Sequence, residues 1–184
     1  MKGKSTYLTV GLAVLALVVA APAAAKFSRH ALLAHAAAGT GAFGPGCTTG
    51  GSQAWCDSRS FVFHLAAISG FSGFPAFGYF DRTNVANGNT FAGSVTCLSV
   101  SGNQASVGGF VTRTPGGSGT GVPFLVYVLD NGRSSAALSD GISPFAIVGP
   151  EETPVAGFPY VCPPPASPLG YHSLTSGDII VLGG

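Results

Sequence analysis

Charged side chains are scarce in this chain of 184 residues: Asp, Glu, Lys and Arg together make up 8% of it, against roughly 25% in typical soluble domains. Beyond residue 25, six cationic side chains face seven carboxylates, which is a formal charge of −1. Because no basic patch is present, neither a nucleic acid nor an anionic membrane surface is expected as a partner. The 13 Phe residues argue against disorder, since disordered chains are poor in aromatic residues.

Long apolar runs are also missing, with one exception near the N-terminus. This run extends from Leu8 to Ala21 behind a short basic end, and it stops at Pro22 and three alanines. That order of segments is typical of a secretory signal peptide, whereas a membrane anchor wants roughly 20 apolar residues. We therefore predict a signal peptide at residues 1–25, cleavage before Lys26, and a secreted or periplasmic protein with no membrane span after cleavage.

Helical periodicity is absent beyond residue 40, where frequent Gly and Pro oppose helix. Short apolar or alternating runs recur instead between Gly, Asn, Pro and Asp, which is typical of strands joined by turns. Strands are expected at residues 61–66, 77–81, 91–100, 104–112, 122–129, 142–148 and 178–182. Gly93 and Gly108-Gly109 lie inside two of these runs and indicate bends that help a sheet to curl. We predict an all-β fold, an antiparallel β-barrel or sandwich of about seven short strands, and favour the barrel.

Two stretches lack a strand pattern. Residues 26–46 are rich in Ala and Gly; Ser28 could begin a short helix that ends at Gly39, but the composition favours a flexible leader. We therefore predict a leader at 26–46 and a single β domain at 47–184. Pro150 to Pro168 is too rich in proline for a central strand and is expected to form one long ordered loop.

Closely spaced cysteine pairs, which structural zinc sites prefer, are missing, and we assign no metal or other cofactor. Four cysteines in an exported chain indicate disulfides, for which three pairings exist. Cys47 and Cys56 flank a Thr-Thr-Gly-Gly stretch that can turn back, while Cys97 falls in a predicted strand and Cys162 in the proline-rich loop. We favour the pairing Cys47–Cys56 and Cys97–Cys162.

Catalytic motifs are absent as well. The Gly-x-Ser-x-Gly elbow of serine hydrolases needs a strand-to-helix turn, and residues 70–73 and 117–119 do not supply it. Asp130 and Asp140 lie beside Asn or Gly, as turn residues do. A calcium loop or a carboxylate pair for glycoside hydrolysis is the less favoured interpretation. We assign no catalytic residue.

Histidines and aromatic residues are the remaining candidates. His64 lies on a predicted strand, opposite in phase to Phe61, Phe63 and Leu65, and is interpreted as an exposed strand residue rather than an acid or base. His30, His35 and His172 are scattered and would bind a metal only if the fold gathered them. One aromatic concentration is interpreted mainly as core, with a ligand groove as the alternative; it comprises Trp55, Phe71, Phe74, Phe77, Tyr79 and Phe80.

Short motifs follow one another in a distinctive order over the second half of the chain. They are GSVTCL at 93–98, VSGNQA at 100–105, VGG at 107–109, VLDNG at 128–132 and GDIIV at 177–181. This order resembles a β-rich domain of secreted bacterial proteins, the post-COAP-1-like family. The resemblance covers residues 60–183. It implies a compact β-barrel-like fold outside the cytoplasm, and it supplies neither an activity nor catalytic residues.

These features favour a secreted, non-enzymatic β domain that acts in binding or as a structural module of the cell exterior. The alternative is a small secreted β-barrel enzyme, a hydrolase or cyclase-like protein, with a pocket at one mouth of the barrel. An enzyme needs converging titratable groups, and this chain has few. The arrangement of His64, Asp130 and Asp140 in the fold is therefore the observation that discriminates between the two hypotheses.

Overall fold

The computed structural model describes residues 35–52, 56–132, 139–149, 154–167 and 169–183. The predicted signal peptide and its cleavage site lie outside these residues. Within the described ranges the chain forms strands, turns and loops but no helix, so no helix there could cross a membrane.

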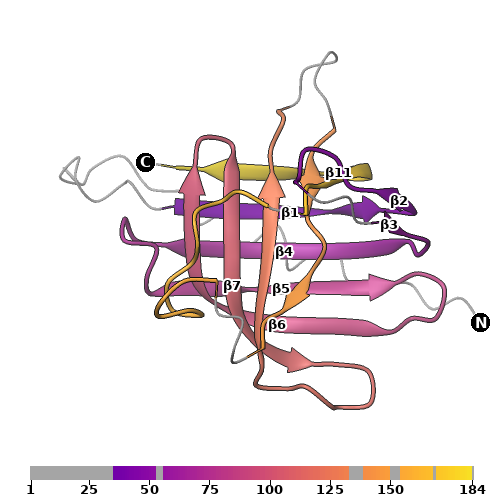
Figure 1. Ribbon diagram of the computed structural model, residues 1–184, viewed down its shortest axis with the longest axis horizontal. Helices are drawn as coiled ribbons and strands as arrows, with labels where there is room; N and C mark the ends of the chain where they lie inside the picture. Colours follow the sequence, from indigo (N-terminus) through magenta and orange to yellow (C-terminus); the bar gives the residue numbers. More distant parts are fainter. Residues whose placement is uncertain (1–34, 53–55, 133–138, 150–153, 168, 184) are drawn as a thin grey trace, which may run out of the picture. The chain divides into compact units, whose positions relative to one another are not determined.

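In the described part of the chain, eight antiparallel strands close into a barrel. They are β1 (His35–Phe43), β4 (Phe61–Ser69), β5 (Ala76–Asn84), β6 (Thr90–Ser101), β7 (Gln104–Arg113), β8 (Pro123–Leu129), β9 (Gly141–Ile142) and β11 (His172–Leu182). Each pairs with the next strand of this series, and β11 pairs with β1 to complete the circle. Figure 1 shows β1, β4 and β5 crossing β7 at a steep angle, as opposite walls of a barrel do. The predicted antiparallel β-barrel is confirmed.

Three short strands lie outside this circle. β10 (Ala146–Ile147) pairs with the first half of β8, on the edge of β8 that does not pair with β7. β2 (Gly46–Cys47) pairs with β3 (Cys56–Asp57) in a separate ladder. The predicted strand at 142–148 is therefore two short strands, β9 and β10, with a connection between them.

β6 turns from one wall of the barrel into the other (Figure 1). Its register with β7 shifts between Ala92 and Gly93 and again between Val95 and Cys97. A Cβ on Gly93 would lie 2.3 Å from the Phe124 ring, and one on Gly109 would lie 1.9 Å from the Ser94 carbonyl oxygen. Glycine is thus required where the sheet bends, as predicted.

β1 overturns the expectation of a flexible leader, or a helix up to Gly39, for residues 35–46. It pairs with β4 along its whole length and with β11 on its other side. A Cβ on Gly39 would lie 2.7 Å from the Asp178 carbonyl oxygen, and one on Gly41 would lie 3.2 Å from the Phe63 ring. Neighbouring strands already fill this part of the interior, so only small residues let β1 fit. The domain therefore includes residues 35–46 and does not begin at Cys47.

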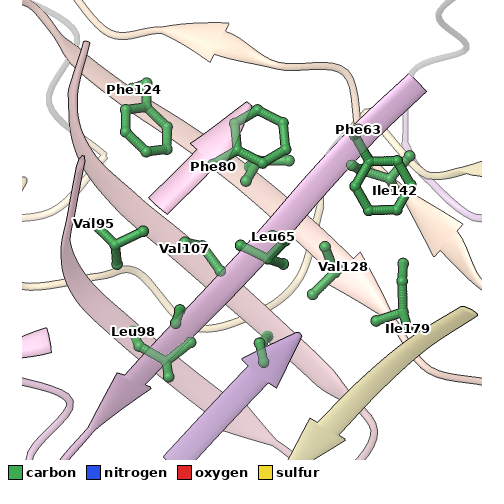
Figure 2. Packing of buried hydrophobic residues seen from close by; sticks show 14 of the residues in the cluster. Phe63, Leu65, Phe80, Val95, Leu98, Val107, Phe124, Val128, Ile142 and Ile179 are labelled. Atoms are coloured by element: carbon green, nitrogen blue, oxygen red, sulfur yellow. The ribbon is translucent and has the colours of Figure 1, made fainter. Parts of the chain in front are cut away.

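The barrel interior is filled by apolar side chains. Phe61, Phe63 and Leu65 of β4 are at most 5% exposed, as the alternation along this strand predicted. Phe80 from β5 stacks on Phe124 from β8, with ring centroids 6.0 Å apart. Figure 2 shows Phe63, Leu65, Phe80 and Phe124 in the interior together with aliphatic residues from β6, β7, β9 and β11. Groups that could bind a ligand are therefore to be sought at the ends and on the outer face of the barrel.

Both predicted disulfides are present, and no cysteine is free. Cys47–Cys56 joins β2 to β3. Cys97–Cys162 joins β6 to the proline-rich segment 154–167, which is ordered as predicted; residues 150–153 and 168 lie outside the described ranges.

The segment 154–167 covers part of the outer wall. Phe158 packs with Cys97, Leu125 and Val148 in an apolar cluster separate from the barrel core. The Thr96 hydroxyl donates a hydrogen bond to the Pro159 carbonyl at 2.7 Å. Disulfide, apolar contact and hydrogen bond together hold this segment against β6 and β8.

Candidate functional site

Asp130 and Asp140 lie at the seam where the barrel closes. The two residues of β9 bridge β8 and β11. Beyond β9, the N–H of Ile179 donates to Asp140 Oδ2 at 2.7 Å and the N–H of Val181 donates to Asp130 Oδ2 at 3.0 Å. The other oxygen of each carboxylate accepts a backbone N–H of the turn after β8 at 2.8 Å. Beyond the two residues of β9, the two carboxylates thus accept the N–H groups of β11 that a neighbouring strand would otherwise bind.

This arrangement favours a structural role for both aspartates. All four carboxylate oxygens already accept backbone hydrogen bonds, which leaves the calcium and glycosidase hypotheses without support. Among the described residues, no group of three or more His, Cys, Asp or Glu side chains is placed to hold a metal ion.

His64 lies on the outer face of the β4–β5 pair, away from this seam. Its Nδ1 atom is 3.0 Å from Asp81 Oδ2, and 53% of its side chain is exposed. The interpretation of His64 as an exposed strand residue is confirmed. The structure therefore does not bring His64, Asp130 and Asp140 into one cavity.

The other histidines lie apart. His172 is 4% exposed at the start of β11, with its ring 5.6 Å from that of Phe43, and burial lowers the pKa of its imidazole. His35 begins β1 opposite Ser69 of β4, and its Nδ1 and the Ser69 hydroxyl are buried without a hydrogen-bond partner in the described structure. His30 lies outside the described residues.

The aromatic concentration divides between core and surface. Phe80 is buried in the barrel, whereas the expectation of core packing is wrong for four of its neighbours, which are 40–65% exposed: Phe71, Phe74, Phe77 and Tyr79. Trp55 lies outside the described residues. The reason is the alternation of β5, in which Phe80 takes the inward phase and leaves the outward phase to Phe77 and Tyr79.

A groove of about 150 Å³ lies between the loop before β5 and the segment 154–167 that covers the outer wall. Phe74 and Tyr160 meet there edge to face with ring centroids 5.9 Å apart, and Tyr160 also contacts Phe110 at 5.8 Å. The hydroxyl-bearing residues Ser72 and Ser99 line the same groove. We call the following set the aromatic surface: Phe71, Phe74, Phe77, Tyr79, Tyr160 and Val161.

Uncharged side chains continue this surface across three further strands. Cross-strand register places Phe77 of β5 beside Ile68 of β4, Ala36 of β1 and Leu182 of β11. The next row is Tyr79, Ala66, Ala38 and Ile180. Charge begins in the third row, with Asp81, His64 and Asp178. Contiguous exposed apolar surface of this kind marks interaction sites in soluble proteins.

Four residues of the aromatic surface, Phe71, Phe74, Phe77 and Tyr79, were expected mainly in the core, and the pattern of the sequence did not single out Tyr160 or Val161. Period-two alternation shows that Phe77 and Tyr79 share one face, but it does not show which face points inward. For Phe71 and Phe74 the geometry favours the alternative interpretation, a ligand groove, because both residues line it.

Comparison with known proteins gives no match to a protein-family model, to a curated protein or to a solved structure. The resemblance to the post-COAP-1-like family therefore stays a prediction, and function has to be inferred from the geometry above.

Proposed function

We propose that this chain is a secreted, non-enzymatic binding module that engages its ligand through the aromatic surface. One observation carries the proposal: Phe71, Phe74, Phe77 and Tyr79 are 40–65% exposed next to a packed barrel. Burying a large apolar side chain stabilises a protein by about 1.5–3 kcal/mol, and these residues forgo much of that gain. Aromatic residues are also enriched where binding energy concentrates.

The segment 154–167, which covers the outer wall, forms one side of the groove. Tyr160 lies two residues before Cys162, whose disulfide to Cys97 anchors it to β6. A wall that is held in place before binding loses less conformational entropy when the ligand arrives. The same disulfides support a location outside the cytoplasm, in agreement with the N-terminal signal-peptide pattern.

The lining of the groove favours an apolar or sugar-like ligand. Phenyl and phenol rings offer flat apolar faces, and Ser99 offers a hydroxyl group for a hydrogen bond, whereas the hydroxyl of Ser72 already donates to the Phe74 carbonyl. Among the described lining residues there is no Asp, Glu, Lys or Arg. His35 is the one ionisable imidazole in this lining, and its buried Nδ1 has no hydrogen-bond partner in the described structure, so it adds one polar contact to a mainly apolar groove.

The alternative, a small secreted barrel enzyme, has one observation in its favour. Asp57, Arg59, Arg82 and His172 lie near one another at the barrel mouth opposite the aromatic surface. The Asp57 carboxylate accepts hydrogen bonds from the Arg59 guanidinium, and the imidazole of His172 is buried. This leaves no free general base among the four side chains, so binding remains the favoured function.

Retention of the oxidised mature protein on insoluble polysaccharides, together with binding of the apolar dye ANS, tests the proposal. We expect retention or dye binding, and at least a tenfold loss in the Phe74→Ala and Tyr160→Ala variants. Val85→Ala is the matched control, because Val85 is 60% exposed in the turn after β5 and lies outside the aromatic surface. Equal loss in the control, or no loss in either groove variant, would refute the site.

A hydrolase screen separates the two functions. Turnover by the wild-type protein that is lost in folded His172→Gln or Arg82→Met variants would establish the enzyme. Asp130 and Asp140 are unsuitable for this test, because their replacement removes backbone acceptors at the seam.

A further inference from the structure

Arg82 lies inside the barrel mouth at the far end of β4 from the groove. It is near the end of β5 and pairs with Phe63 of β4 and Phe91 of β6. Its guanidinium carbon lies 4.9 Å from the ring centre of Phe61 and 4.8 Å from that of Phe145. The two rings favour a cation between them through their negative faces.

The positive charge at this mouth exceeds the negative charge. Arg59 lies over the same Phe61 ring, 5.4 Å from its centre. The nearby Asp57 accepts hydrogen bonds from the backbone N–H, Nε and Nη2 of Arg59 at 2.8–2.9 Å. Because burial lowers the pKa of the neighbouring His172 below its usual value, that imidazole is neutral at pH 7. Among the described residues of this mouth, two guanidinium groups and one carboxylate thus give a net charge of +1.

The donors of Arg82 have no acceptor in the described structure. Arg82 carries five N–H donors, yet it forms neither a hydrogen bond nor an ion pair with a described residue. Buried polar atoms without a partner are limited, in the described ranges, to His35 Nδ1 and Ser69 Oγ. The guanidinium nitrogens therefore keep some contact with solvent at the mouth, although burial of the side chain lowers the pKa of Arg82 to about 10.

We infer that this mouth is a binding site for an oxyanion, a carboxylate or phosphate group held by Arg82. The two rings hold the guanidinium in place, and its unpaired donors suit such a group, since a guanidinium fork offers two parallel N–H bonds to a carboxylate or phosphate. A purely structural arginine in this environment would be expected to pair with a carboxylate of the protein. Among the described residues the nearby carboxylate, that of Asp57, is already bound to Arg59, which leaves the donors of Arg82 for the negative charge of a ligand.

Nuclear magnetic resonance of the ¹⁵N-labelled, oxidised mature protein tests this inference. Sodium phosphate and sodium acetate are titrated separately, with sodium chloride holding the ionic strength constant. We expect saturable shifts at the amides of Phe61 and Arg82 for at least one oxyanion, with a dissociation constant on the order of 1 mM. The anion with the lower dissociation constant shows whether the site prefers a phosphate or a carboxylate group.

Arg82→Met keeps the length and apolar stem of the side chain, and it is expected to weaken oxyanion binding at least about tenfold. Arg113→Met, which removes an exposed arginine at the end of β7, is the matched control and should bind like the wild type. If Arg82→Met does not fold, Arg82→Lys replaces it; the charge remains but the fork is lost, and weaker binding is expected.

Three results would overturn the site: no saturable shift with either oxyanion, equal shifts with chloride alone, or unchanged binding in the folded Arg82 variant. The outcome is independent of the aromatic surface, because Phe74→Ala should leave the oxyanion titration unchanged.

Discussion

Asp140→Asn tests the idea that carboxylates close the barrel seam. Asp140 is 6% exposed, and both of its oxygens accept backbone N–H groups, at 2.8 Å from Asn131 and 2.7 Å from Ile179. Asparagine has the same shape but a single acceptor oxygen. One of the two N–H groups must therefore face an amide NH₂ and lose its acceptor.

The magnitude follows from the type of bond that is lost. A hydrogen bond to a charged group contributes about 1.5–3 kcal/mol, and an unsatisfied buried donor costs about 1–3 kcal/mol. Because these two terms overlap, we expect the free energy of unfolding to fall by about 2–4 kcal/mol. That is a large fraction of the roughly 5–15 kcal/mol that holds a typical domain together.

Urea unfolding of the oxidised protein, followed by far-ultraviolet circular dichroism, measures this loss as a lower midpoint at an unchanged slope. Amide hydrogen exchange should also accelerate at Ile179. The matched control is Asp81→Asn, which removes the half-exposed pair with His64 and should cost less than about 1 kcal/mol. A stability within about 0.5 kcal/mol of the wild type, the range of neutral surface changes, would refute the reasoning, as would unchanged exchange at Ile179.

Four further predictions concern the disulfides, the pH dependence of stability, signal-peptide cleavage and the contribution of β1. Replacing Cys97 and Cys162 by Ala should lower the free energy of unfolding by about 4 kcal/mol, and replacing Cys47 and Cys56 by about 2.5–3 kcal/mol, because the first pair closes the longer loop; calorimetry that ranks the two pairs in the opposite order would contradict this. Burial lowers the pKa of His172, so as the pH falls through about 6.5 the unfolded chain takes up a proton that the folded protein does not, and stability should decrease from pH 7.5 to 5.5. Urea midpoints at both pH values should show a smaller decrease for His172→Gln, and an equal decrease would exclude His172 as its source. Intact-mass analysis of the exported protein should find Lys26 or a near neighbour as the first residue; an exported chain that begins at Met1 would disprove cleavage. A variant that begins at Cys47 should lack the cooperative unfolding of one that begins at Lys26, because it has no β1 to join β4 to β11.

Local patterns in the sequence were sufficient for most of the barrel. Along β4, residues 61–65 alternate between large apolar and other side chains, and alternation of this kind specifies a half-buried strand whatever its neighbours are. The short gap between the predicted strands 91–100 and 104–112 is likewise a tight turn, in which Gly102 adopts a φ of 59° that glycine tolerates. The disulfide pairs could be anticipated from chain order and export.

Only the tertiary structure decided the role of β1, the aromatic residues and the charged groups. Ala and Gly have little strand propensity, and β1 becomes a strand because Phe63 and Ile179 fill the space that its own side chains would need. Phe77 is exposed because Phe80 takes the inward phase against Phe124. Asp140 is a structural acceptor because it binds an N–H group of β11, which is distant in the sequence. Arg82 lies between the rings of Phe61 and Phe145, which come from different segments of the chain. Sequence periodicity reports which residues share a face, whereas burial and charge pairing depend on contacts between distant segments.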